Sequence, residues 1–199
     1  MPPNGRQARW HAVSRLRRGL PARLLGAALA LTMTMNAPAD GTFSASAVKG
    51  VFLFNFASFV RWPDAAFANR NADLVYCTMG RDDVVAVLPG ILAGETVDGH
   101  RLSLRAVDDP GQLAGCHVVY LADGADSTLA PMLQRRGRHP VLTVSSTTGF
   151  ATRGGHIELE VSDRRVRPRI NAAAVADSGL SVSAQLYRLA TVVDTDTAR

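Results

Sequence analysis

The sequence predicts a single domain of the α/β class, with an open mixed sheet flanked by helices and a β-hairpin near the C-terminus. Its 199 residues are 47% hydrophobic and 20% charged, which is the composition of a globular chain rather than a disordered one. Helix and strand signals alternate along most of the chain. No internal repeat or low-complexity segment divides it.

The first 39 residues are predicted to be a secretory signal peptide, leaving a mature domain of residues 40–199. Six arginines and no acid precede Asp40, and the apolar run 24–31 leads to the small-x-small pair Ala37 and Ala39. An uncleaved anchor is the alternative, and Arg17-Arg18 also resembles a weak twin-arginine export signal. From Asp40 on, 16 basic residues face all 17 acidic ones, so the argument for a nucleic-acid partner is lost with the leader.

The first half of the mature chain reads as helix, strand, helix, strand. Ser44 or Ser46 caps a phenylalanine-rich helix over 48–60, which Pro63 ends. A buried strand over 74–79 follows. Asp82 and Asp83 open a helix through 88, then a turn over 94–99 leads to a half-exposed strand over 102–106.

The second half adds two buried strands and then changes pattern. Strands are predicted over 117–121 and 141–144, with a helix over 126–136 between them. Alternating residues then predict a hairpin of 157–161 and 166–170 with Asp163-Arg164 as its turn. Two short helices separated by Gly179 end the chain.

The residue types agree with a protein that is not an enzyme. The sequence lacks the nucleophile elbow, the dinucleotide and phosphate loops and the H-E-x-x-H motif. Its five histidines show no metal-ligand spacing, so neither a metal nor a cofactor is expected. Cys77 and Cys116 either form a disulfide, which export favours, or are two separately buried thiols.

The hairpin carries charges whose partners the alternation predicts. Glu158 and Glu160 share one strand face, and we expect a solvated face on which they pair with arginines across the turn. The arginines on that face are a candidate surface for an acidic partner or lipid headgroups: Arg165, Arg167 and Arg169.

The segments 48–63, 92–100, 113–121, 149–151, 154–157, 167–171 and 178–180 resemble, in that order, the YfiR-like periplasmic proteins. The resemblance covers roughly 47–193. It implies a periplasmic repressor of an inner-membrane diguanylate cyclase, acting on the cyclase's periplasmic domain. It also implies that the repressor forms a homodimer and that a peptidoglycan-associated outer-membrane lipoprotein can sequester it. The cyclase is then released, which raises cyclic-di-GMP and favours biofilm formation.

The resemblance also assigns residues. It implies that Cys77 and Cys116 are joined, and that the second cysteine pair of some members, near 148–155, is missing here. It points to a small-molecule site that uses Arg61 beside Trp62, with Ser183 in the matching C-terminal stretch, which here lacks basic residues. A surface arginine capping its own helix is the alternative for Arg61, and a free-standing periplasmic module for a nucleotide or aromatic ligand is the alternative function.

Overall fold

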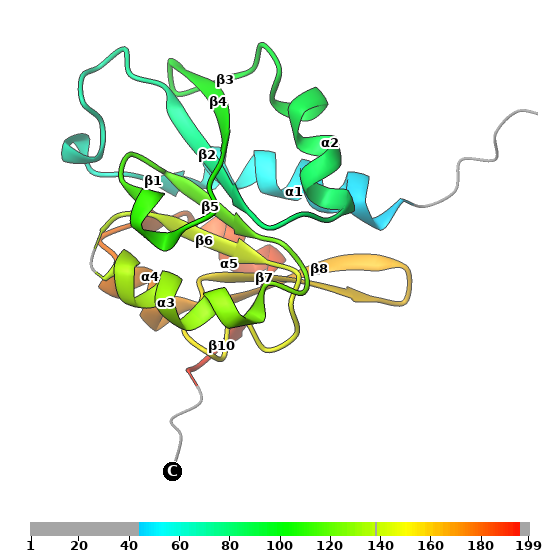
Figure 1. The fold of residues 1–199 in the computed structure, drawn as a ribbon. Coiled ribbons are helices and arrows are strands. Elements are labelled where there is room, and N and C mark those ends of the chain that lie inside the picture. Colours follow the sequence, from blue (N-terminus) through cyan, green and yellow to red (C-terminus); the bar gives the residue numbers. More distant parts are fainter. Residues whose placement is uncertain (1–43, 138, 196–199) are drawn as a thin grey trace, which may run out of the picture. The chain divides into compact units, whose positions relative to one another are not determined.

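The structure, a computed structural model, describes residues 44–137 and 139–195 and contains an eight-stranded mixed sheet with helices on both faces (Figure 1). This confirms the predicted fold class. The predicted signal peptide and its cleavage site lie outside the described residues.

Five neighbouring strands of the sheet run parallel, and an antiparallel hairpin extends the sheet on one side. The strand order is β10-β8-β7-β6-β5-β2-β4-β3, and a separate antiparallel pair is formed by β1 and β9. The strands are β1 (Val60–Arg61), β2 (Leu74–Met79), β3 (Thr96–Val97), β4 (His100–Ala106), β5 (Val118–Leu121), β6 (Leu142–Ser145), β7 (Ile157–Ser162), β8 (Arg165–Asn171), β9 (Ser181–Val182) and β10 (Thr191–Val193).

The helices divide between the two faces because successive strand residues point to opposite sides. On one face Tyr76, Val118 and Tyr120 belong to a core shared with α1, α2 and α5, whereas on the other Val119 and Leu121 pack with α3 and η2. The helices are α1 (Ala45–Phe59), α2 (Asp83–Leu92), α3 (Asp126–Arg136), α4 (Ala172–Asp177) and α5 (Ala184–Leu189), with 3₁₀ turns η1 (Asp64–Ala66) and η2 (Pro110–Leu113).

Helix α1 begins three residues earlier than predicted, because Ser44 rather than Ser46 is its N-cap and accepts the N–H of Ala47. Its buried side includes Leu53 and Phe56, which are fully enclosed. The Tyr76 hydroxyl donates to the Phe54 carbonyl at 3.2 Å and so joins the helix to β2. The phenylalanine-rich segment is therefore a core helix of this domain.

The predicted hairpin is confirmed, with its turn at Asp163 and Arg164, both in the left-handed region at φ 51° and 58°. Strand β6 pairs with β7 only at Ile157 and Glu158. Beyond that point β7 and β8 continue as a two-stranded ribbon that extends past the rest of the sheet (Figure 1).

Candidate functional site

The largest hollow found among the described residues is a cavity of about 580 Å³ at the end of α1. Apolar side chains of α1, β1 and β2 form part of its wall. The side chains that carry charge, rings or amides come from β1, the η1 segment and the β3–β4 turn: Arg61, Trp62, Asp64, Phe67, Asn69, Arg70, Asp98 and His100.

Arg61 lies at the rim of this cavity, as the last residue of the short strand β1. Its guanidinium forms an ion pair with Asp98 in the β3–β4 turn, and both side chains are exposed. The guanidinium thus donates to a carboxylate rather than to the carbonyls at the end of α1. An exposed pair of this kind contributes little to stability, so Arg61 can exchange Asp98 for another anion.

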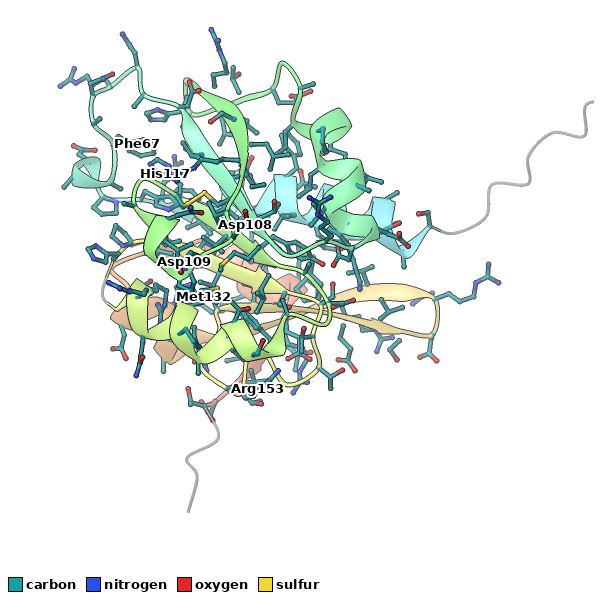
Figure 2. The ribbon with its side chains drawn as sticks, in the orientation of Figure 1. Phe67, Asp108, Asp109, His117, Met132 and Arg153 are labelled. Carbon is teal, nitrogen blue, oxygen red and sulfur yellow. A yellow bond between two sulfur atoms is a disulfide. The ribbon has the colours of Figure 1, made fainter. Side chains whose placement is uncertain are left out.

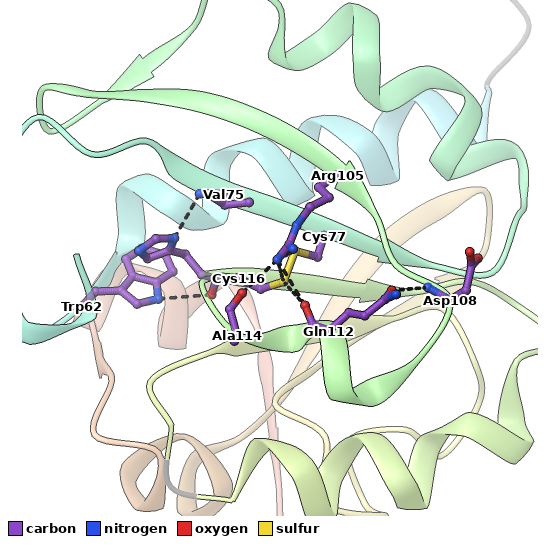
Figure 3. Close-up of a disulfide and its surroundings, with 9 residues drawn as sticks. Trp62, Val75, Cys77, Arg105, Asp108, Gln112, Ala114 and Cys116 are labelled. Atoms are coloured by element: carbon purple, nitrogen blue, oxygen red, sulfur yellow. Dashed lines mark hydrogen bonds between the residues drawn. A yellow bond between two sulfur atoms is a disulfide. The ribbon is translucent and has the colours of Figure 1, made fainter. Parts of the chain in front are cut away.

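Trp62 is fixed in the wall of the cavity by its indole N–H, which donates to the carbonyl of His117 at 3.2 Å (Figure 3). The His117 ring lies edge-on to Trp62, with 6.3 Å between the ring centres. Trp62 thus anchors the end of β1 to the start of β5.

Two histidines that sequence reasoning passed over hold the η1 segment in place. The Phe67 ring stacks on the His100 ring, with 4.0 Å between the ring centres. It also stacks on the His117 ring, with 4.4 Å between the ring centres (Figure 2). The His117 ring accepts the Val75 N–H at Nδ1 and donates from Nε2 to the Ala66 carbonyl. Burial lowers the pKa of His117, so the neutral ring that these bonds require is favoured.

The histidines were missed because metal-ligand spacing was the only pattern tested for them. Their role depends on loop carbonyls and a stacked ring, which no sequence spacing encodes. His100 donates from Nδ1 to the Ala72 carbonyl at 2.7 Å, so the two rings hold both ends of the segment that carries Asn69 and Arg70.

Ser183 does not line the cavity. Its backbone N–H donates to the Phe59 carbonyl at 2.8 Å, and its hydroxyl caps α5 by accepting the Leu186 N–H. Strand β9 pairs with β1, which sets Arg61 opposite Ser181. The C-terminal stretch is therefore adjacent to Arg61, but Ser183 has a capping role.

The disulfide expected from the resemblance is present. Cys77 of β2 and Cys116, which precedes β5, are bonded with their Cα atoms 5.9 Å apart. One Arg105 nitrogen lies 3.2 Å from the Cys116 sulfur and donates to the carbonyls of Gln112 and Ala114 (Figure 3). Arg105 thus holds the turn that presents Cys116 to β2.

The hairpin arginines share one face as predicted, but the expectation that Glu158 is solvated is wrong. Arg169 lies opposite Glu158 and Arg167 opposite Glu160. Glu158 is only 1% exposed, because it accepts the Ala151 N–H of the covering loop and pairs with Arg169 at 3.2 Å. Arg169 is therefore partly buried in its ion pair with Glu158, whereas Arg165 and Arg167 are exposed on the candidate partner surface.

α/β folds commonly bind ligands at the C-terminal edge of their parallel strands. At this edge the Asp82 carboxylate already accepts three hydrogen bonds from the protein. Asp82 caps α2 through the Val85 N–H and accepts the Tyr120 hydroxyl at 2.8 Å and the Asp123 N–H at 3.0 Å. Burial is the main cause that raises the pKa of Tyr120. Among residues 44–137 and 139–195, no three acidic, histidine or cysteine side chains gather as metal ligands.

The described residues thus form a disulfide-bonded α/β domain with a cavity at the end of α1. A family model described as YfiR/HmsC-like matches residues 46–191, and the chain belongs to this family. Membership indicates a regulator in cyclic-di-GMP signalling rather than a catalyst. The disulfide fits an oxidising compartment. In the part of the chain that the structure describes, no helix is long and apolar enough to cross a membrane.

Proposed function

We propose that this protein is a periplasmic repressor that binds the periplasmic domain of an inner-membrane diguanylate cyclase and keeps the cyclase inactive. The observation that carries the proposal is the YfiR/HmsC-like match over residues 46–191, which spans the sheet and nearly all of its helices. The leader predicted over residues 1–39 would export the chain and then be removed.

The ribbon formed by β7 and β8 is the surface we assign to the cyclase. Arg165 and Arg167 are exposed on one side of it, and Val161 is 45% exposed near its tip. Arg167 is 4.0 Å from Asp163 and opposite Glu160, and these exposed contacts are weak enough for a partner to replace them. An acidic partner surface would complement the face that carries these arginines, and Val161, which pairs with Val166, adds an apolar contact on the opposite face of the ribbon.

The same proposal includes a homodimer and an antagonist. A peptidoglycan-associated outer-membrane lipoprotein would bind the repressor and release the cyclase, raising cyclic-di-GMP and favouring biofilm formation. Such control is a population shift, in which the repressor must prefer the inactive cyclase by several kcal/mol to keep most of it silent.

Deletion and complementation test the repressor function. Deleting the gene should raise cellular cyclic-di-GMP, and the wild-type gene should restore the original level. Complementation with Arg167→Glu should fail while the variant is still exported and folded, because the charge reversal leaves the core untouched. An unchanged cyclic-di-GMP level in the deletion strain would reject the repressor function.

A small-ligand binding module is the second candidate, and the cavity beside Arg61 is the observation that favours it. Its 580 Å³ lies within the range of small-molecule sites, and an arginine at the rim beside ring walls suits a planar anion such as a nucleotide or an aromatic acid. If this is the function, Arg61→Ala should abolish the binding of such a ligand in calorimetry, and deletion should leave cyclic-di-GMP unchanged.

A further inference from the structure

A second hollow of about 390 Å³ lies beside the disulfide, and it differs in charge from the cavity at Arg61. Its basic side chains come from the end of α3 and the residues after it, namely Arg135, Arg136 and His139. No aspartate or glutamate lines it, whereas Asp64 and Asp98 line the first cavity.

The basic side chains of this hollow are not held in ion pairs with carboxylates. Within the described part of the chain, no ion pair includes Arg135, Arg136 or His139. Asp177 acts on Arg136 electrostatically without forming such a pair.

Of the three side chains, Arg136 has an enclosed nitrogen that forms no hydrogen bond. Its guanidinium contacts the buried ring of His156, and its Nε is enclosed with no hydrogen-bond partner. Burial lowers the pKa of Arg136, and the charge of Asp177 opposes this shift. Buried cations are normally paired with an anion.

The dipole of α3 explains only part of this arrangement. Carbonyl groups at a helix C-terminus attract exposed cations within the last turn, and Arg135 fits that description. The dipole does not explain why Arg136 is partly buried without a carboxylate, nor why His139, beyond the helix, joins the same hollow.

We propose that this hollow is a binding site for a small phosphate-bearing ligand, held by Arg135, Arg136 and His139. Guanidinium groups bind phosphate oxygens through paired hydrogen bonds, and a dianion would supply the charge that Arg136 lacks. The volume exceeds what free phosphate needs, so the site suits a small phosphomonoester as well.

A ligand in this hollow would contact the η1 segment. Ala65 and Ala66 line it from η1, on the side opposite Asp64 and Phe67, which line the first cavity. The η1 segment thus lies between the two hollows. A bound anion would connect η1 and the Cys116 turn to the end of α3, and this site is independent of the proposed repressor surface on β7 and β8.

Titration calorimetry of the mature protein with inorganic phosphate, at constant ionic strength, tests the proposal. We expect one site with a sub-millimolar Kd, weakened at least fivefold by Arg135→Ala and by His139→Ala, both of which change exposed side chains. The matched control Arg164→Ala removes an exposed arginine at the hairpin turn and should leave the Kd unchanged. Absence of binding, or equal weakening by all three variants, would overturn the proposal. Arg136 is left intact because it contacts the core.

Discussion

His156 is a buried polar residue whose protonation state affects the stability of the folded domain. His156 is completely enclosed, and its backbone N–H donates to the Thr143 hydroxyl at 3.0 Å. Its ring accepts the Thr143 N–H and lies against Arg136, and burial, reinforced by that guanidinium, lowers its pKa to about 3. The folded state therefore requires a neutral ring.

This requirement predicts a loss of stability in mild acid. Because the folded pKa is below the unfolded value of about 6.5, the unfolded chain gains a proton first, and stability falls from pH 6.5 toward pH 3. Between pH 7.5 and 5 the free energy of unfolding should drop by about 2 kcal/mol through His156. Urea unfolding of the wild type and of His156→Gln measures it; equal pH slopes in both would contradict the assignment.

The two hairpin glutamates form a matched pair for mutation. Glu158→Gln should lower the free energy of unfolding by about 2 kcal/mol, because the partly buried Arg169 loses its counter-charge. Glu160→Gln, on the same strand face but exposed, should change it by less than about 0.5 kcal/mol. Denaturant unfolding compares them, and similar losses for both variants would show that burial of Glu158 is not decisive.

At the scale of elements, the close approach of α1 to α2 depends on a missing side chain. A Cβ added at Gly50 would lie 2.5 Å from Ile91 and 3.1 Å from Val87, whereas one added at Gly90 would meet nothing within 4 Å. Both glycines are within helices, where alanine is ordinarily favoured by about 1 kcal/mol.

The two glycines should therefore respond to alanine with opposite signs. Gly90→Ala should raise the free energy of unfolding by about 0.5–1 kcal/mol, and Gly50→Ala should lower it by about 1 kcal/mol because the overpacking outweighs the helix gain. Thermal unfolding of the two variants decides this. A stabilised Gly50→Ala protein would show that the side chains of Ile91 and Val87 can move aside without cost.

The disulfide links β2 to Cys116, which precedes β5, within the core that Val119 and Leu121 form with α3. It closes a loop with a sequence separation of 39 residues, which in the chain-entropy model corresponds to about 4 kcal/mol. Cys77→Ser and the double variant with Cys116→Ser should lose similar stability, because either opens the same loop. Calorimetry with and without reductant measures the loss; no change on reduction would contradict a stabilising role.

At the scale of the whole molecule, the sequence predicted the long elements and missed the short ones. The helix over 126–136 is predicted with its observed ends, and the hairpin is correct to within a residue or two. The strands β1, β3, β9 and β10 were missed, since two or three residues carry no readable alternation and exist only through their partners.

The same limit applies to the sites. Arg61 and Trp62, which the sequence indicates as candidate ligand-binding residues, line the first cavity. The His100–Phe67–His117 stack and the hollow at Arg136 are assembled from segments far apart in the chain. The burial of Glu158 was unpredictable for the same reason, because the loop that covers it arrives from residue 151. Tertiary packing, rather than local pattern, decided these residues.

The central claim is that this protein binds the periplasmic domain of a diguanylate cyclase. The direct measurement is the Kd between the purified mature protein and the periplasmic domains of the membrane diguanylate cyclases encoded beside it or elsewhere in the same genome. We predict that one of them binds, and that Arg167→Glu weakens the complex at least tenfold, equivalent to about 1.4 kcal/mol, while its unfolding curve matches the wild type. Absence of binding to every such domain would contradict the account.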